Sequence, residues 1–208
     1  MSMHGDPVCR ICRREGEKLF LKGEKCYTKC TLDRRPFPPG MHGQARRRKV
    51  SDYGIQLRAK QRARKIYGVQ ETQFRNYFDA AATKTGPTGL ELLRRLELRL
   101  DNVAYRAGFA ASRAEGRQLA SHRHLTVNGR PANVPSMELR VGDVVGVRNK
   151  SKDILPISRS QEMLAYRPMP VWLEAQANAD AVRISALPNR EEMETSIEEH
   201  LIVEYYSR

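Results

Sequence analysis

Residues 112–129 read SRAEGRQLASHRHLTVNG, and this stretch decides the fold class. Its first serine and the glutamate three positions later form a capping box, which should start a short helix that runs to about His122. Leu125–Val127 reads as a strand, and the Asn-Gly dipeptide after it is the strongest short-range signal for a hairpin. Val144–Val147 reads as another strand. The pattern predicts helices packed on a small antiparallel sheet in an α+β protein.

Upstream of this stretch, apolar residues recur at helical spacing. We expect helices over residues 53–67 and 71–83. A third should begin near Leu90, and its periodicity continues to Gly108. Residues 1–50 are rich in Gly and Pro and are expected to be mostly loop.

Downstream of the hairpin the pattern is weaker. We expect a short helix over residues 158–167 and a strand over 181–186. Ser196 and Glu199 repeat the capping-box spacing, so the last helix should start there.

The positive charge of the chain is concentrated at one end. Formal net charge is +13 over 208 residues, and residues 1–68 hold 18 Lys+Arg against 6 Asp+Glu, a net of +12. Such a field is typical of a protein with a phosphate-rich partner. The length allows one large domain or two small ones. No apolar run is long enough to span a membrane, and the N-terminus lacks a signal peptide, so we expect a cytoplasmic protein with reduced thiols.

All four cysteines lie in this basic third. Cys9 and Cys12 are separated by two residues, and Cys26 and Cys30 by three. Two such pairs can complete a tetrahedral all-sulfur shell, which is the usual structural zinc site. Four thiolates can also hold an iron–sulfur cluster. Two disulfides or four unligated thiols are the structural alternatives.

The basic residues form two groups of candidate ligands for a nucleic acid, either RNA or DNA. Along the helix over 53–67, like charges repeat at three- and four-residue spacing, where they repel in an isolated helix. We expect phosphates to neutralise them. The first group comprises Arg10, Arg13, Arg14, Lys22, Arg46, Arg47, Arg48, Lys49, Arg58, Arg62 and Lys65. The second comprises Arg113, Arg117, His122, Arg123, His124, Asn128 and Arg130.

Several segments together resemble a known family. Those that resemble the S-four RNA-binding domain are Arg99–Ala110, Ser112-Arg113, Arg117–Leu119, His122-x-His124 and Val127–Gly129. Further matches are Arg13–Gly16, Pro39-Gly40-x-His42-Gly43, Ser51–Tyr53, Lys65–Gly68, Gln73–Asn76 and His200–Arg208. From end to end the chain is similar to the bacterial small-subunit ribosomal protein S-four family, in its zinc-finger-bearing form.

The resemblance implies an organisation and a role. It implies a cysteine module and basic loop over 1–50, a helical part over 51–95, an S-four domain over 96–187, and a segment over 188–208 that returns to the N-terminal lobe. Members are structural constituents of the small ribosomal subunit that bind its RNA early in assembly. The loop over 46–49 is expected to face messenger RNA at its entry site. The C-terminal segment is expected to meet neighbouring ribosomal proteins and to influence translational accuracy.

Two other classes of function compete with this interpretation. S-four domains are also attached to pseudouridine synthases and tyrosyl-tRNA synthetases, but too little chain remains here for a catalytic domain. Asp101, which echoes a synthase catalytic residue, is expected to cap a helix or to join an internal ion pair. A zinc-dependent DNA-binding regulator would place its basic residues on one helix. The basic residues of this chain are instead spread over loop, helix and hairpin, which favours a folded RNA as the partner. Since too little chain remains for a catalytic domain, we also expect no enzyme.

Overall fold

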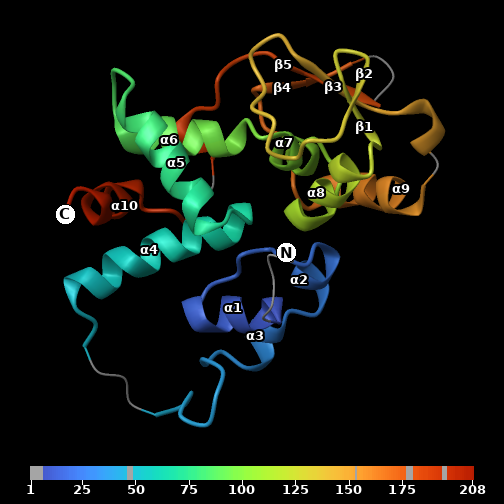
Figure 1. Cartoon of the computed structure of the whole chain (residues 1–208). Coiled ribbons are helices and arrows are strands. Elements are labelled where there is room, and N and C mark those ends of the chain that lie inside the picture. Colours follow the sequence, from blue (N-terminus) through green and yellow to red (C-terminus); the bar gives the residue numbers. More distant parts are fainter. Residues whose placement is uncertain (1–6, 46–48, 153, 177–179, 194–195) are drawn as a thin grey trace. The chain divides into compact units, whose positions relative to one another are not determined.

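The computed structural model describes residues 7–45, 49–152, 154–176, 180–193 and 196–208. The chain divides into two compact units, one formed by Met1–Glu91 with Ser196–Arg208 and the other by Leu92–Thr195. Helices and one antiparallel sheet confirm the expected α+β class (Figure 1). Within these described ranges, no helix combines the length and the hydrophobicity needed to cross a membrane.

The first unit is helical. Its elements are α1 (Val8–Glu15), α2 (Glu24–Thr28), α3 (Thr31–Arg34), α4 (Asp52–Tyr67), α5 (Glu71–Ala82), the start of α6 (Thr88–Glu97) and α10 (Glu199–Tyr206). As expected, most described positions of residues 1–50 lie in loops and turns, and three short helices, α1, α2 and α3, lie among them. The glycines mark their ends: Gly16 closes α1 with φ +78°, and Gly23 precedes α2 with φ +58°.

Helix α4 has the boundaries that its sequence predicts. Ser51 caps it by accepting a hydrogen bond from the backbone N–H of Gly54 (3.3 Å), and Gly68 ends it in the left-handed region. The next helix, α5, is confirmed as well.

The capping box expected at the start of α10 does not form. The N-cap is Glu198, and no side chain caps the helix. The carbonyl of Ser196 instead accepts a hydrogen bond from Arg62 on α4 (3.0 Å), and Ile197 is buried. Contacts with the rest of the unit therefore hold this turn in place of a local cap.

The second unit contains the sheet, with strand order β2-β1-β3-β5-β4 and every pair antiparallel. The strands are β1 (Leu125–Val127), β2 (Arg130–Ala132), β3 (Val144–Val147), β4 (Leu173–Ala175) and β5 (Ala181–Ile184). The hairpin is confirmed: Asn128 and Gly129 both have positive φ, +50° and +78°, as a tight primed turn requires. The Asn128 side chain donates to Asp143 (2.9 Å) and accepts from the Val144 N–H (2.9 Å).

The helix expected to continue to Gly108 is broken in two. Helix α6 ends at Glu97, and α7 (Leu100–Arg106) follows after Arg99, which is extended and bridges to Glu138. The N–H of Leu100 donates to Met137 (2.9 Å). A segment almost forty residues away thus takes the backbone bonds that a continuous helix would use.

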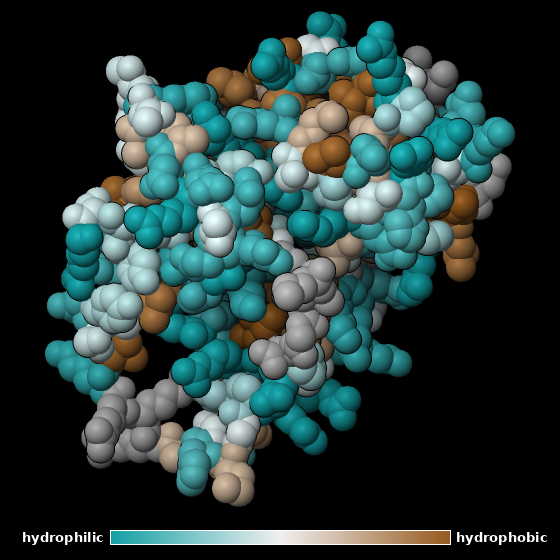
Figure 2. Space-filling model, viewed as in Figure 1, coloured by the Kyte–Doolittle hydropathy of each residue, from teal (hydrophilic) through white to brown (hydrophobic). Residues whose placement is uncertain are grey.

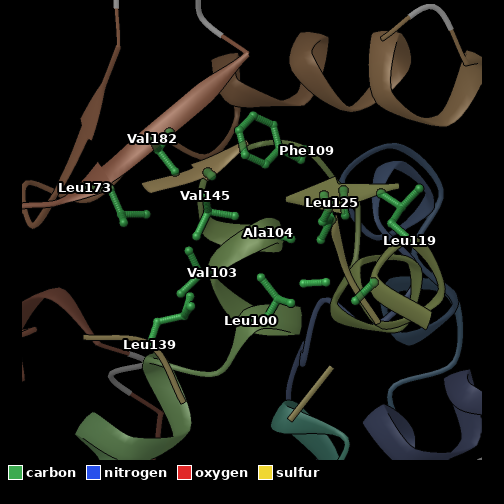
Figure 3. Packing of buried hydrophobic residues seen from close by; sticks show 14 of the residues in the cluster. Leu100, Val103, Ala104, Phe109, Leu119, Leu125, Leu139, Val145, Leu173 and Val182 are labelled. Atoms are coloured by element: carbon green, nitrogen blue, oxygen red, sulfur yellow. The ribbon is translucent and has the colours of Figure 1, made fainter. Parts of the chain in front are cut away.

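Helices α7 and α8 (Arg113–Ser121) cover the core of this unit. Leu100, Val103 and Ala104 on α7 point toward Leu125 and Val145 of the sheet (Figure 3). Farther along, α9 (Leu155–Glu162) begins three residues before the expected start, and a 3₁₀ turn, η2 (Met163–Ala165), follows it. The remaining 3₁₀ turns are η1 (Asn149–Ser151) and η3 (Arg190–Glu192).

Candidate nucleic-acid interface

The four cysteines converge on one small pocket. Helix α1 places Cys9 and Cys12 almost one turn apart, Cys26 lies on α2, and Cys30 is the N-cap of α3. All four line a cavity of about 20 Å³, and all four are free thiols, which excludes disulfides in this structure. The fold thus brings two pairs of cysteines that are distant in the sequence to the lining of one pocket.

The electrostatics of the cluster reflect this proximity. Burial raises the pKa of the Cys12 thiol, the backbone N–H of Leu19 opposes that effect, and the other three cysteines add to it. Burial also raises the pKa of Cys26, whose sulfur accepts a hydrogen bond from the N–H of Lys22 (3.3 Å). Among the described residues, no three His, Cys, Asp or Glu side chains form, as they stand, a group that could hold a metal ion. Four thiols that line one pocket are nevertheless a suitable donor set for a zinc ion or an iron–sulfur cluster, once the side chains turn toward the metal.

Helices α1 and α4 enclose a second, larger pocket of about 250 Å³. It brings together four of the expected RNA ligands: Arg10, Arg14, Arg58 and Lys65. Glu15 and Gln61 also line this pocket. Sequence reasoning missed both as site residues, because no spacing signal indicated that α1 packs against α4.

The basic face of α4 is not uncompensated, contrary to the expectation from its sequence. The guanidinium of Arg58 pairs with Glu15, and Arg62 pairs with Glu17 (3.2 Å). Glu71 receives both Lys60 and Arg64, each at 2.8 Å. These carboxylates come from outside the helix, so inspection of α4 alone could not reveal them. The helix carries a fifth cation, Lys65, which makes no ion pair with any residue of the described ranges.

The other basic residues near the cysteines differ in what they contact. Arg13 donates to the carbonyls of Phe37 (2.9 Å) and Pro38 (3.2 Å), and its guanidinium lies 5.1 Å from the Phe37 ring centroid. It therefore anchors the loop that follows α3. Lys22 lines the cysteine pocket, and Lys49 is exposed. Arg46, Arg47 and Arg48 lie outside the described residues.

In the second unit, Arg113 is turned inward. Its side chain donates to Asn102 Oδ1 (2.7 Å) and lies over the Tyr105 ring (4.6 Å), and the residue is only 8% exposed. Asn102 in turn donates to buried Glu97 (2.7 Å). Arg117, with its side chain 43% exposed, approaches Asp101 at 3.6 Å. Only the second of these two arginines presents its guanidinium to solvent.

The loop from α8 to β1 presents the remaining candidates. His122 and Arg123 are exposed, and Arg123 adopts a positive φ of +61°. His124 lies with its Nδ1 2.9 Å from Ser151 Oγ. Asn128 and Arg130 are exposed at the hairpin. In the view of Figure 2 most of the visible residues are hydrophilic, and hydrophobic residues appear in separate areas.

Besides its contact with Arg117, Asp101 in the S-four-like segment has a buried partner. Asp101 receives two hydrogen bonds from Arg99, at 3.1 and 2.7 Å, and one from the Asn102 N–H (2.9 Å). Both partners of the ion pair are buried. The expectation that Asp101 is a cap or ion-pair residue is confirmed.

Comparisons with known proteins cover the whole chain. A family model described as "Ribosomal protein S4/S9 N-terminal domain" matches residues 4–97, and one described as "S4 domain" matches residues 98–145. The chain is 56% identical to the small ribosomal subunit protein uS4 of Natranaerobius thermophilus over 209 residues. It is 54% identical to the proteins of the same name from Heliobacterium modesticaldum and Nitratidesulfovibrio vulgaris, also over 209 residues. Each match covers 100% of both chains.

Proposed function

This chain belongs to the family of the small ribosomal subunit protein uS4, and from that premise we propose that it binds small-subunit ribosomal RNA directly and nucleates assembly of the subunit. The family is structural and non-enzymatic, and its place is the cytoplasmic ribosome. The observation that carries the RNA proposal is the net charge of +12 over residues 1–68, from 18 Lys+Arg against 6 Asp+Glu. A charge of that density favours a polyanion.

Direct binding is tested with the full-length protein at physiological salt. It is titrated against a small-subunit ribosomal RNA fragment and against a DNA duplex with the same number of phosphates. We expect the RNA to bind roughly tenfold tighter or more, because a folded RNA offers shape in addition to charge. Equal affinity for both would contradict the proposal.

We also propose that Cys9, Cys12, Cys26 and Cys30 hold one zinc ion with a structural role. Their convergence on one pocket and their free thiols support this, as do the backbone N–H groups directed at Cys12 and Cys26. Such donors stabilise thiolate ligands. Bound zinc would link α1, α2 and α3, and its binding would release the thiol protons.

The zinc proposal predicts about one metal ion per chain. Substitution Cys26→Ser should abolish it, while the fluorescence of Trp172, the single tryptophan and a buried residue of the second unit, stays native. Elemental analysis measures the metal. Iron with visible absorption would identify the iron–sulfur alternative, and no metal together with intact thiols would refute both.

At the level of the assembled subunit, we propose that Arg46–Lys49 faces messenger RNA at the site where it enters the small subunit. We also propose that the C-terminal segment contacts a neighbouring ribosomal protein and influences translational accuracy. Support comes from the family resemblance and from four consecutive cations. Arg47→Gln with Arg48→Gln should lower messenger crosslinking to assembled subunits. The control is Arg34→Gln with Arg35→Gln, which removes the same charge elsewhere. Equal crosslinking in both would contradict the assignment.

A further inference from the structure

The pocket between α1 and α4 is a candidate for a specific ligand. It measures about 250 Å³ and is lined by Arg10, Arg14, Glu15, Arg58, Gln61 and Lys65, among others. We propose that it binds one phosphate group of an RNA backbone. This inference rests on the proposed function, which supplies RNA as the source of the phosphate.

The charges of the pocket are only partly neutralised. Arg58 is held by Glu15, whose side chain is 5% exposed, so one cation and the one carboxylate offset each other. The side chains of Arg10, Arg14 and Lys65 make no ion pair with any residue in the described part of the chain. The pocket therefore carries a net charge of +3 from four cations and one carboxylate. An entering anion meets cations that are not already engaged.

The two helices contribute to the pocket from different directions. Arg10 and Arg14 are one turn apart on α1, and Arg58 and Lys65 are two turns apart on α4. Arginine forks match phosphate oxygens in a bidentate manner, and a lysine adds a compact charge. Because Glu15 fixes Arg58, less side-chain freedom is lost when the anion binds.

The size of the pocket suits a small anionic group. Pockets for organic ligands typically measure about 300–1,000 Å³, and this one is smaller. A phosphate group fits within that space, and the cations that line the pocket match its charge. The pocket therefore contributes positioning of the RNA backbone rather than recognition of a base.

The experiment uses phosphate-ethylation interference on a small-subunit ribosomal RNA fragment with the full-length protein. Arg14→Gln with Lys65→Gln removes from each helix one cation that pairs with no described carboxylate. The matched control, Arg34→Gln with Arg35→Gln, removes the same charge from exposed residues outside the pocket. Thermal unfolding verifies that both variants fold.

We expect one or two adjacent phosphates whose ethylation weakens binding of the wild type and of the control but not of the pocket variant. The pocket variant should also lose roughly tenfold in affinity. Identical interference maps for the pocket variant and the wild type would overturn the inference while leaving RNA binding intact. A polyglutamate peptide provides a further test. If it binds the control but not the pocket variant, and both variants bind RNA equally well, the pocket takes an acidic protein segment and the inference is overturned.

A titration with inorganic phosphate separates the source of the ligand. Shifts of α1 and α4 amide signals in the wild type, absent from the pocket variant, would support the anion site even if the RNA itself failed to bind. In that case the proposed function fails and the anion site stands. If free phosphate saturates the pocket and the ethylation-interference map of the RNA does not change, the RNA backbone is not the source of the bound phosphate, and the inference is overturned.

Discussion

Arg113 shows how burial changes what a basic residue can do. Its sequence context, near Arg117 on the same helix, suggested a pair of exposed RNA ligands. In the structure Arg113 bonds to Asn102 and covers Tyr105, while Arg117 remains half exposed. Breaking the hydrogen bonds of a buried charged side chain lowers stability far more than breaking those of an exposed one, because water cannot take the place of the lost partners.

These two arginines should therefore separate stability from binding. Arg113→Ala should lower the free energy of unfolding of the second unit by about 2–4 kcal/mol. The substitution leaves the side-chain Oδ1 of Asn102 without this donor and removes the guanidinium that packs on the Tyr105 ring. Arg117→Ala should change it by less than about 1 kcal/mol. Urea titration followed by Trp172 fluorescence measures both. Equal losses would mean that Arg113 is not held as described.

At the scale of elements, α4 and α10 are joined by a cluster of polar and aromatic side chains. Lys60 is 4% exposed, pairs with Glu71 (2.8 Å) and lies 4.5 Å from the Tyr205 ring centroid. Tyr206 donates to Glu71 (2.9 Å). Glu71 thus receives bonds from both helices, and its ionisation supports their packing.

The ionisation of Glu71 predicts a pH dependence. Burial raises its pKa, but the bonds from Lys60 and Tyr206 and the charge of Arg64 outweigh this, so the folded-state pKa is lowered from 4.5. A lowered folded-state pKa stabilises the fold above the unfolded value, and this contribution is lost as pH falls through the folded value. Wild type should thus be more stable than Glu71→Gln at pH 7, and the difference should shrink below pH 4.5.

The measurement is hydrogen exchange of α10 amides in both proteins as the pH is lowered. Glu138→Gln serves as the control, because Glu138 is a partly exposed carboxylate of the second unit with a longer ion pair (3.4 Å). A stability difference between wild type and Glu71→Gln that stays constant down to pH 3 would contradict the assignment.

At the scale of the whole molecule, the positive charge is concentrated in residues 1–68, all of which belong to the first unit. Residues 1–68 hold a net of +12, and the remaining 140 residues hold 19 Lys+Arg against 18 Asp+Glu. The first unit should thus supply most of the salt-sensitive attraction to RNA. The second, with its exposed hairpin and α8 loop, should contribute register and specificity.

Affinity for ribosomal RNA should therefore fall steeply with salt. If about six to ten phosphates are contacted, the loss is roughly 10³–10⁵-fold between about 50 and 200 mM, somewhat less for irregular RNA. Arg47→Gln with Arg48→Gln should flatten the dependence more than Arg140→Gln with Arg183→Gln, a pair of exposed residues in the second unit that carries the same charge. Filter binding over a salt series measures both. Equal slopes in the two variants would contradict the division of roles.

The sequence by itself determined the elements whose signals are local. Helices α4 and α5 and the Asn128-Gly129 hairpin follow from caps, periodicity and turn residues, each of which acts within a few positions of the chain. The α+β class followed from the same kind of local signal, whereas the family was indicated by the resemblance of several longer segments to known members. Spacing also singled out the four cysteines that line one pocket.

Only the tertiary structure decided the features that depend on distant partners. The break between α6 and α7 exists because Leu98 and Leu100 bond to residues 137–139. Four of the five cations on α4 are paired because α1, α5 and the turn after α1 bring carboxylates to them. Arg113 is buried because Asn102 and Tyr105 on α7 receive it. Periodicity reports which face of an element is apolar, but it carries no information about which charged group will lie opposite, and that choice is made when the chain packs.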